Sequence, residues 1–115
     1  AWFLCREDYR RTDDQGFRWN EIELMSLEGA SDDSRWQSQV RGFWDHHFPF
    51  MLAVHSDYDY LAVSLEEQSF GGIVHGHSPE FEEPSIVAPS FTEFLVLFEL
   101  AASGKKEEYP LSLFL

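Results

Sequence analysis

The amino-acid sequence predicts a small α+β domain, from its length, from strand-like segments in its middle and from a capped helix near its end. A chain of 115 residues falls near the middle of the usual range for one domain, so residues 1–115 are expected to form a single unit. Its 11 Phe, 4 Trp and 4 Tyr supply much of the apolar core that such a domain needs.

The N-terminal part has the weakest pattern. Residues 1–9 begin with an apolar run and residues 12–16 are dense in turn-forming residues, which predicts a turn between two extended segments. The second segment runs from Phe17 to Met25. Polar and apolar residues alternate from Asn20 to Leu24, as they do in a half-buried strand.

A short amphipathic helix is predicted from about Arg35 to Asp45. Residues 31–34 offer several possible N-caps, and Trp36 and Val40 stand four residues apart with Phe43 and Trp44 behind them, which places all four on one helical face.

The middle of the chain predicts an antiparallel meander. Residues 50–54 form an apolar run of strand length, and residues 60–65 form a second one behind a polar turn. Residues 72–75 are a third strand candidate, which makes a meander the simplest topology. Residues 77–83 are polar and contain Pro79, so a surface loop is expected there.

The clearest local signal is a capping box at Ser90 and Glu93. Behind it an apolar stripe continues at helical spacing through Ala102, and Gly104 offers a left-handed C-terminal cap, followed by two lysines that suit the negative end of the helix dipole. This segment is predicted to be a helix whose aromatic stripe packs into the core.

The formal net charge of −13 narrows the classes of partner. Nucleic-acid affinity depends on cationic groups that neutralise phosphates, and anionic membranes attract cations for the same reason, so neither is expected to bind. A basic protein is the natural complement, because opposite fields raise association rates. The alternative is that the charge only keeps the surface soluble.

A cytoplasmic location is expected. The lone Cys5 cannot form an internal disulfide, no apolar run approaches the ~20 residues of a membrane span, and no signal peptide is visible. The chain starts at Ala1 rather than at a Met, which leaves open that N-terminal residues are missing.

The sequence contains no motif for catalysis or for binding a metal or a cofactor. The five histidines and the many carboxylates invite a metal site, with His75 and His77 on one strand face, yet no zinc or calcium spacing is met. Cys5 lies in an apolar stretch where burial would raise its thiol pKa, and nucleophile elbows and phosphate loops are absent. We therefore expect neither an enzyme nor a cofactor.

The acidic loops are therefore the candidate partner-binding regions. The candidate partner-binding residues are Asp57, Asp59, Glu66, Glu67, Glu80, Glu82 and Glu83. The alternative for each is a solvated acidic face without a partner.

Three segments together resemble a known family: FPFMLAVHSDYDYLAVSL from Phe48, GGIVHGH from Gly71 and APSFTEFL from Ala88. Their order and spacing resemble the Smi/Knr family of the SUKH superfamily, over about residues 48–98, with residues 24–28 a weaker companion. The chain lacks the glycine common before the aspartate of the family's turn, and its Asn-Gly-Gly element.

The resemblance implies an α+β fold with a mainly antiparallel sheet flanked by helices. It also implies a non-catalytic binding role, since many bacterial members are immunity proteins that neutralise toxins and fungal relatives regulate cell-wall synthesis. The leading hypothesis is an immunity protein that binds a basic toxin domain. A regulatory or scaffold module is the alternative, and a metal-dependent enzyme or sensor is a third.

Overall fold

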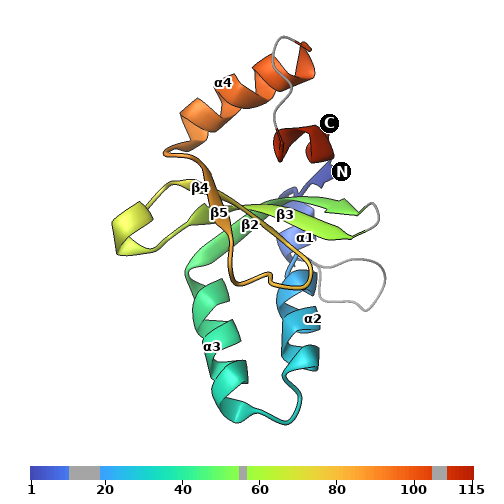
Figure 1. Ribbon diagram of the computed structural model, residues 1–115, viewed down its shortest axis with the longest axis vertical. Helices are drawn as coiled ribbons and strands as arrows, with labels where there is room; N and C mark the ends of the chain where they lie inside the picture. Colours follow the sequence, from blue (N-terminus) through green and yellow to red (C-terminus); the bar gives the residue numbers. More distant parts are fainter. Residues whose placement is uncertain (11–18, 55–56, 105–108) are drawn as a thin grey trace.

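The computed structural model describes residues 1–10, 19–54, 57–104 and 109–115. Its elements are β1 (Trp2–Phe3), α1 (Arg6–Arg10), α2 (Glu21–Gly29), α3 (Ser34–Asp45), β2 (His47–Val54), β3 (Tyr58–Ser64), the 3₁₀ turn η1 (Glu67–Ser69), β4 (Ile73–His77), β5 (Ser85–Ala88), α4 (Phe91–Ala102) and the 3₁₀ turn η2 (Leu111–Phe114). A central sheet separates α2 and α3 from α4 and η2 (Figure 1). The predicted α+β class, with an antiparallel sheet flanked by helices, is confirmed. None of the described helices has the length and apolar character needed to cross a bilayer.

The sheet is an antiparallel meander in which each strand pairs with the next one in the chain, in the order β1-β2-β3-β4-β5. The predicted hairpin is β2 and β3, with Leu52 opposite Tyr60. Its register shifts between Pro49 and Met51, and Pro49 has no N–H to donate to a neighbouring strand. β5 is an addition that the sequence did not predict.

Two apolar cores lie on opposite faces of the sheet. Tyr60 and Ala62 of β3 point toward α2 and α3, whereas Leu61 points toward α4 and η2. A strand covered on both sides reads as a continuous apolar run, because both of its faces are buried. This explains why residues 50–54 and 60–65 look uniformly apolar.

The two predicted long helices are confirmed, together with their caps. The Asp33 carboxylate accepts a hydrogen bond from the Trp36 N–H at 3.0 Å at the start of α3. At the start of α4 the Ser90 hydroxyl accepts from the Glu93 N–H at 3.2 Å. Gly104 follows α4 with a φ of 74°, the left-handed conformation expected of a terminating glycine.

The N-terminal prediction was partly wrong. Residues 21–25, expected to be extended, belong to the helix α2, which buries Ile22 against α3 and the sheet. Alternation over five residues also fits a helix when Ile22 and Met25, three apart, share the buried side. The first segment is extended only over β1, because the Asp8 carboxylate accepts from the Cys5 N–H at 2.7 Å and starts α1. The expected turn at 12–16 lies outside the described residues.

Candidate protein-binding surface

The basic residues are distributed unevenly along the chain. Residues 46–104, which include β2 to β5 and α4, contain no Lys or Arg. The same segment carries nine acids: Asp57, Asp59, Glu66, Glu67, Glu80, Glu82, Glu83, Glu93 and Glu99. Most of the sheet and the last helix are therefore free of cationic side chains, and seven of these acids are the predicted partner-binding residues.

Asp59 is not available to a partner. It lies in β3 rather than in an exposed turn, is only 7 % exposed, and its Oδ1 is 2.8 Å from Nε2 of His75 on the neighbouring strand. Burial lowers the pKa of His75, against the opposing effect of Asp59, so the imidazole is neutral at pH 7 and its Nε2–H donates to the carboxylate. The structure corrects the prediction for this residue, which belongs to a buried polar pair.

Glu82 also has an internal role. Its Oε2 accepts hydrogen bonds from Nε1 of Trp44 at 3.0 Å and from Oγ of Ser26 at 2.9 Å. One carboxylate therefore ties the loop between β4 and β5 to both α3 and α2. The sequence showed only an acidic loop residue, because its two donors lie 38 and 56 positions away in the chain.

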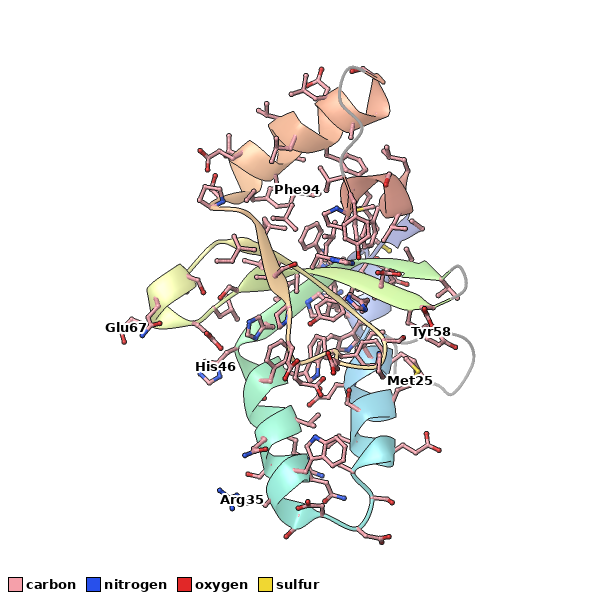
Figure 2. All side chains as sticks on the ribbon, in the orientation of Figure 1. Met25, Arg35, His46, Tyr58, Glu67 and Phe94 are labelled. Atoms are coloured by element: carbon pink, nitrogen blue, oxygen red, sulfur yellow. The ribbon has the colours of Figure 1, made fainter. Side chains whose placement is uncertain are left out.

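The remaining five acids are exposed but lie in two separate places. Asp57 precedes β3, and Glu80 and Glu83 lie in the nearby loop, which the Ser78 N–H joins to the Tyr58 carbonyl at 3.0 Å. Glu66 and Glu67 lie beyond the other end of β3, about 23 Å away for a strand of this length. Figure 2 shows Tyr58 and Glu67 on opposite sides of the molecule. The predicted acids do not form one surface.

The second group borders an apolar surface. Phe70 is 73 % exposed and Ile86 is 71 % exposed, which are large fractions for side chains of this kind. They border a hollow of about 370 Å³. Its lining is Glu67, Gln68, Ser69, Phe70, Gly72, Val74, Ile86, Ala88 and Pro89. We call this hollow, together with Glu66, the η1/β5 surface.

The backbone of the η1/β5 surface is held firmly. The Leu65 N–H donates to the His46 carbonyl at 2.7 Å, and the hydroxyls of Ser64 and Ser69 lie 2.7 Å apart. The N–H of Gly71 donates to the Ser64 carbonyl at 2.8 Å, with Gly71 at a φ of 83° that glycine adopts without strain. The turn therefore presents Phe70 from a fixed frame.

A scan of protein-family models, a search of curated proteins and a search of solved structures found no match to this chain. The resemblance to the Smi/Knr family thus rests on the three quoted segments. Those segments correspond to the β2–β3 hairpin, to β4, and to the end of β5 with the start of α4.

A second hollow, of about 390 Å³, lies between α2, α3 and the β4–β5 loop and includes Met25, Trp36 and Phe81 in its lining. Glu82 lines it, but its carboxylate already accepts hydrogen bonds from Trp44 and Ser26. The hydroxyls of Ser26 and Ser78, which also line it, donate to Glu82 and to the Tyr58 carbonyl, so this hollow is mainly an apolar cleft.

Groups able to do chemistry are few among the described residues. No cluster of three or more His, Cys, Asp or Glu within residues 1–10, 19–54, 57–104 and 109–115 has the arrangement of a metal site. Cys5 is exposed, contrary to the burial expected from its apolar neighbours, and lies between β1 and α1 rather than in a strand. The raised pKa of Tyr60 follows from burial, and its hydroxyl donates to the Phe81 carbonyl.

Sequence reasoning found Glu66 and Glu67 but missed Phe70 and Ile86. Phe70 stands between a polar stretch and Gly71-Gly72, a context that predicts an exposed turn, and this signal was present in the sequence. Ile86 gave no such signal, since exposure of an apolar residue at a sheet edge depends on which strand becomes the edge.

Proposed function

We propose that this domain acts by binding another protein, and that it is a bacterial immunity protein of the Smi/Knr type that neutralises a basic toxin domain in the cytoplasm. The η1/β5 surface carries the proposal: two large apolar side chains stand exposed on a hydrogen-bonded frame, next to the exposed glutamates Glu66 and Glu67.

The two most exposed apolar side chains of this surface are not explained by the fold. Phe70 and Ile86 contribute little to either core, while exposing them to water costs free energy and risks aggregation. Contiguous exposed apolar groups with a polar rim are typical of protein interaction sites, and an aromatic side chain at their centre is a common source of binding energy.

The rigid frame favours tight association. A partner that binds a mobile loop must order it, and ordering costs free energy that reduces affinity. Here the turn from Ser64 to Gly72 is already fixed by the backbone hydrogen bond between the Ser64 N–H and the Gly72 carbonyl, 2.8 Å long. The surface is preorganised for a partner of complementary shape.

The charge distribution favours a basic partner. Residues 46–104 carry nine acids and no Lys or Arg, so a partner that contacts these segments meets a negative field from them. A nuclease toxin, whose substrate groove must be cationic, has the complementary potential. Association is expected to be fast at low salt and slower at physiological salt.

We propose no catalytic role for the polar groups whose pKa is shifted by burial. His75 bonds Asp59, and the Tyr9 hydroxyl, with a pKa raised to about 12 mainly by burial, donates to the Pro49 carbonyl at 2.7 Å. Each of these groups already has an internal partner. The proposal therefore includes neither a cofactor nor a metal.

The test is affinity capture from lysate of the native organism at low and at moderate salt, followed by a functional assay of the protein retained. Recovery of one basic protein whose toxic activity is suppressed by an equimolar amount of this domain would support the immunity role. Recovery of host regulatory proteins with no toxic activity would favour the regulatory or scaffold module. Stoichiometric metal in protein purified without an affinity tag would favour the third hypothesis.

A further inference from the structure

β5 is an edge strand. It stands last in the strand order, and within the part of the chain that the structure describes it pairs only with β4. Alternate residues of an extended edge strand direct their N–H and C=O groups away from the sheet, where another extended segment can bond to them.

The side chains of β5 do little to protect this edge. Natural edges are commonly blocked by lysine, by an inward-pointing charge or by proline within the strand, whereas β5 consists of Ser85, Ile86, Val87 and Ala88. Pro84 and Pro89 flank the strand, and its register with β4 shifts between Ile73 and Val74. These features limit pairing to about four residues but leave the strand itself open.

The free edge and the apolar hollow are continuous. Ile86 and Ala88 of β5 line the hollow together with Phe70. In an added strand, successive side chains point to opposite faces, so every second residue of an incoming segment would lie on the same face of the sheet as Ile86. A segment bonded to β5 would therefore place an apolar side chain beside Ile86, at the rim of the hollow.

Charge decides which segment fits. Glu67 is exposed at the hollow, and Glu66 is exposed next to it with Oε1 4.0 Å from Nε2 of His47. No Lys or Arg occurs in residues 46–104. A second copy of this chain would bring another −13 charge and another pair of these glutamates to the same place, so pairing between two β5 strands is disfavoured. A segment with Lys or Arg next to its apolar residue is complementary.

We infer that the partner binds by adding an extended, basic segment to the free edge of β5, with an apolar side chain beside Ile86 at the rim of the hollow and a Lys or Arg directed toward Glu67. The inference rests on the proposed function and specifies its binding mode: backbone hydrogen bonds supply affinity and the hollow supplies selectivity.

The test uses the capped peptide Lys-Val-Lys-Phe-Lys-Val as a probe of the ¹⁵N-labelled domain by NMR titration. Saturable shifts are expected in residues 66–74 and 85–89, with a dissociation constant of about 0.1–1 mM, as befits one short strand. The same peptide with Glu in place of Lys, and a version N-methylated at alternate residues, should each bind at least fivefold more weakly.

Matched variants locate the site. Ile86→Ser and Glu67→Gln should each weaken binding of the Lys peptide threefold or more. Val96→Ser and Glu99→Gln, which change an exposed apolar and an exposed acidic residue of α4, should leave it unchanged. All four positions are exposed, so the amide spectra of the variants are expected to show an intact fold.

Absence of saturable shifts up to 5 mM peptide would overturn the inference. So would shifts confined to the α2–α3 hollow, equal binding of the N-methylated peptide, or concentration-dependent shifts in β5 without peptide, which would mean self-association. The proposed function is tested separately: if Ile86→Ser captures the partner as well as the parent domain does, the edge mode is wrong while the binding role stands. If the peptide binds as expected but no captured toxin is suppressed, the immunity role fails and the edge mode stands.

Discussion

The indole Nε1 of Trp44 lies 3.0 Å from Oε2 of Glu82, and this bond joins α3 to the loop between β4 and β5. Trp44 is only 8 % exposed and also packs on Tyr60, with ring centroids 4.9 Å apart. A residue that the sequence presents as a surface acid is thus the polar partner of a core tryptophan.

Replacement of this acid tests its structural role. Glu82→Ala is expected to lower the free energy of unfolding by about 1–3 kcal/mol, because the Trp44 N–H and the Ser26 hydroxyl lose their acceptor. Glu82→Gln keeps an acceptor oxygen and should lose less. Urea unfolding followed by tryptophan fluorescence gives both values. Glu83→Ala, at the exposed neighbour, is the control and should stay within about 0.5 kcal/mol of the parent.

Stability is expected to fall on mild acidification because of His75. Burial holds its pKa below the ordinary 6.5, against the attraction of Asp59 and with a small contribution from His77. Between the lowered value and 6.5 the unfolded chain binds more protons than the folded one, so the free energy of unfolding decreases as the pH falls through that range and is constant above it.

Urea unfolding at several pH values from 7.5 to 5.0 measures the slope of the unfolding free energy against pH. His75→Asn should flatten it, at the cost of lower stability overall, since Asp59 then loses its partner. The same measurement on His46→Gln, at an exposed histidine, is the control. An unchanged slope in His75→Asn would show that another group carries the pH dependence.

Glu23 is expected to be a mildly destabilising residue. Burial raises its pKa, and repulsion from Asp45 adds to this, with Arg41 acting in the opposite direction. Glu23→Gln should therefore raise the stability at pH 7 by roughly 0.5 kcal/mol, a small value because solvent screens a half-exposed carboxylate. A raised pKa means that the folded state binds the proton more readily, so the gain should shrink as the pH falls toward 4. A gain of the same size at pH 4 would contradict this electrostatic explanation.

The fold is expected to be destabilised by even the smallest substitution of Gly76, to alanine. A Cβ at this position would overlap the ring of Tyr60, which is fully buried and whose hydroxyl is bonded to the Phe81 carbonyl. Gly76→Ala should cost about 1–3 kcal/mol of unfolding free energy, measured by thermal or urea unfolding. Gly42→Ala provides the contrast: its Cβ meets nothing within 4 Å, and alanine inside α3 should add about 0.5–1 kcal/mol.

Phe70 is expected to matter for binding and not for folding. At 73 % exposure, Phe70→Ser should change the unfolding free energy by less than about 0.5 kcal/mol while abolishing most of the affinity for the Lys peptide. Phe94→Ala, at a fully buried phenylalanine, should instead cost about 3–5 kcal/mol. A large loss of stability in Phe70→Ser would assign that side chain to the core.

The sequence predicted a helix or strand correctly where the residues that determine it lie close together in the chain. The cap of Asp33 on α3, the Ser90–Glu93 box on α4 and the apolar runs of β2 and β3 each span a few residues, so periodicity and capping chemistry found them. α2 was missed because five alternating residues fit both a strand and a helix, and its packing on α3 made the choice.

The candidate surface shows where the sequence stops being informative. By itself the sequence determined the negative charge, the acidic residues and the meander that carries them. Only the tertiary structure decided that Asp59 faces His75 and Glu82 faces Trp44, leaving Glu67 beside the hollow that Phe70 and Ile86 line. The physical reason is that burial and hydrogen bonding depend on neighbours distant in the chain, and those neighbours are set by strand register and by which strand ends the sheet.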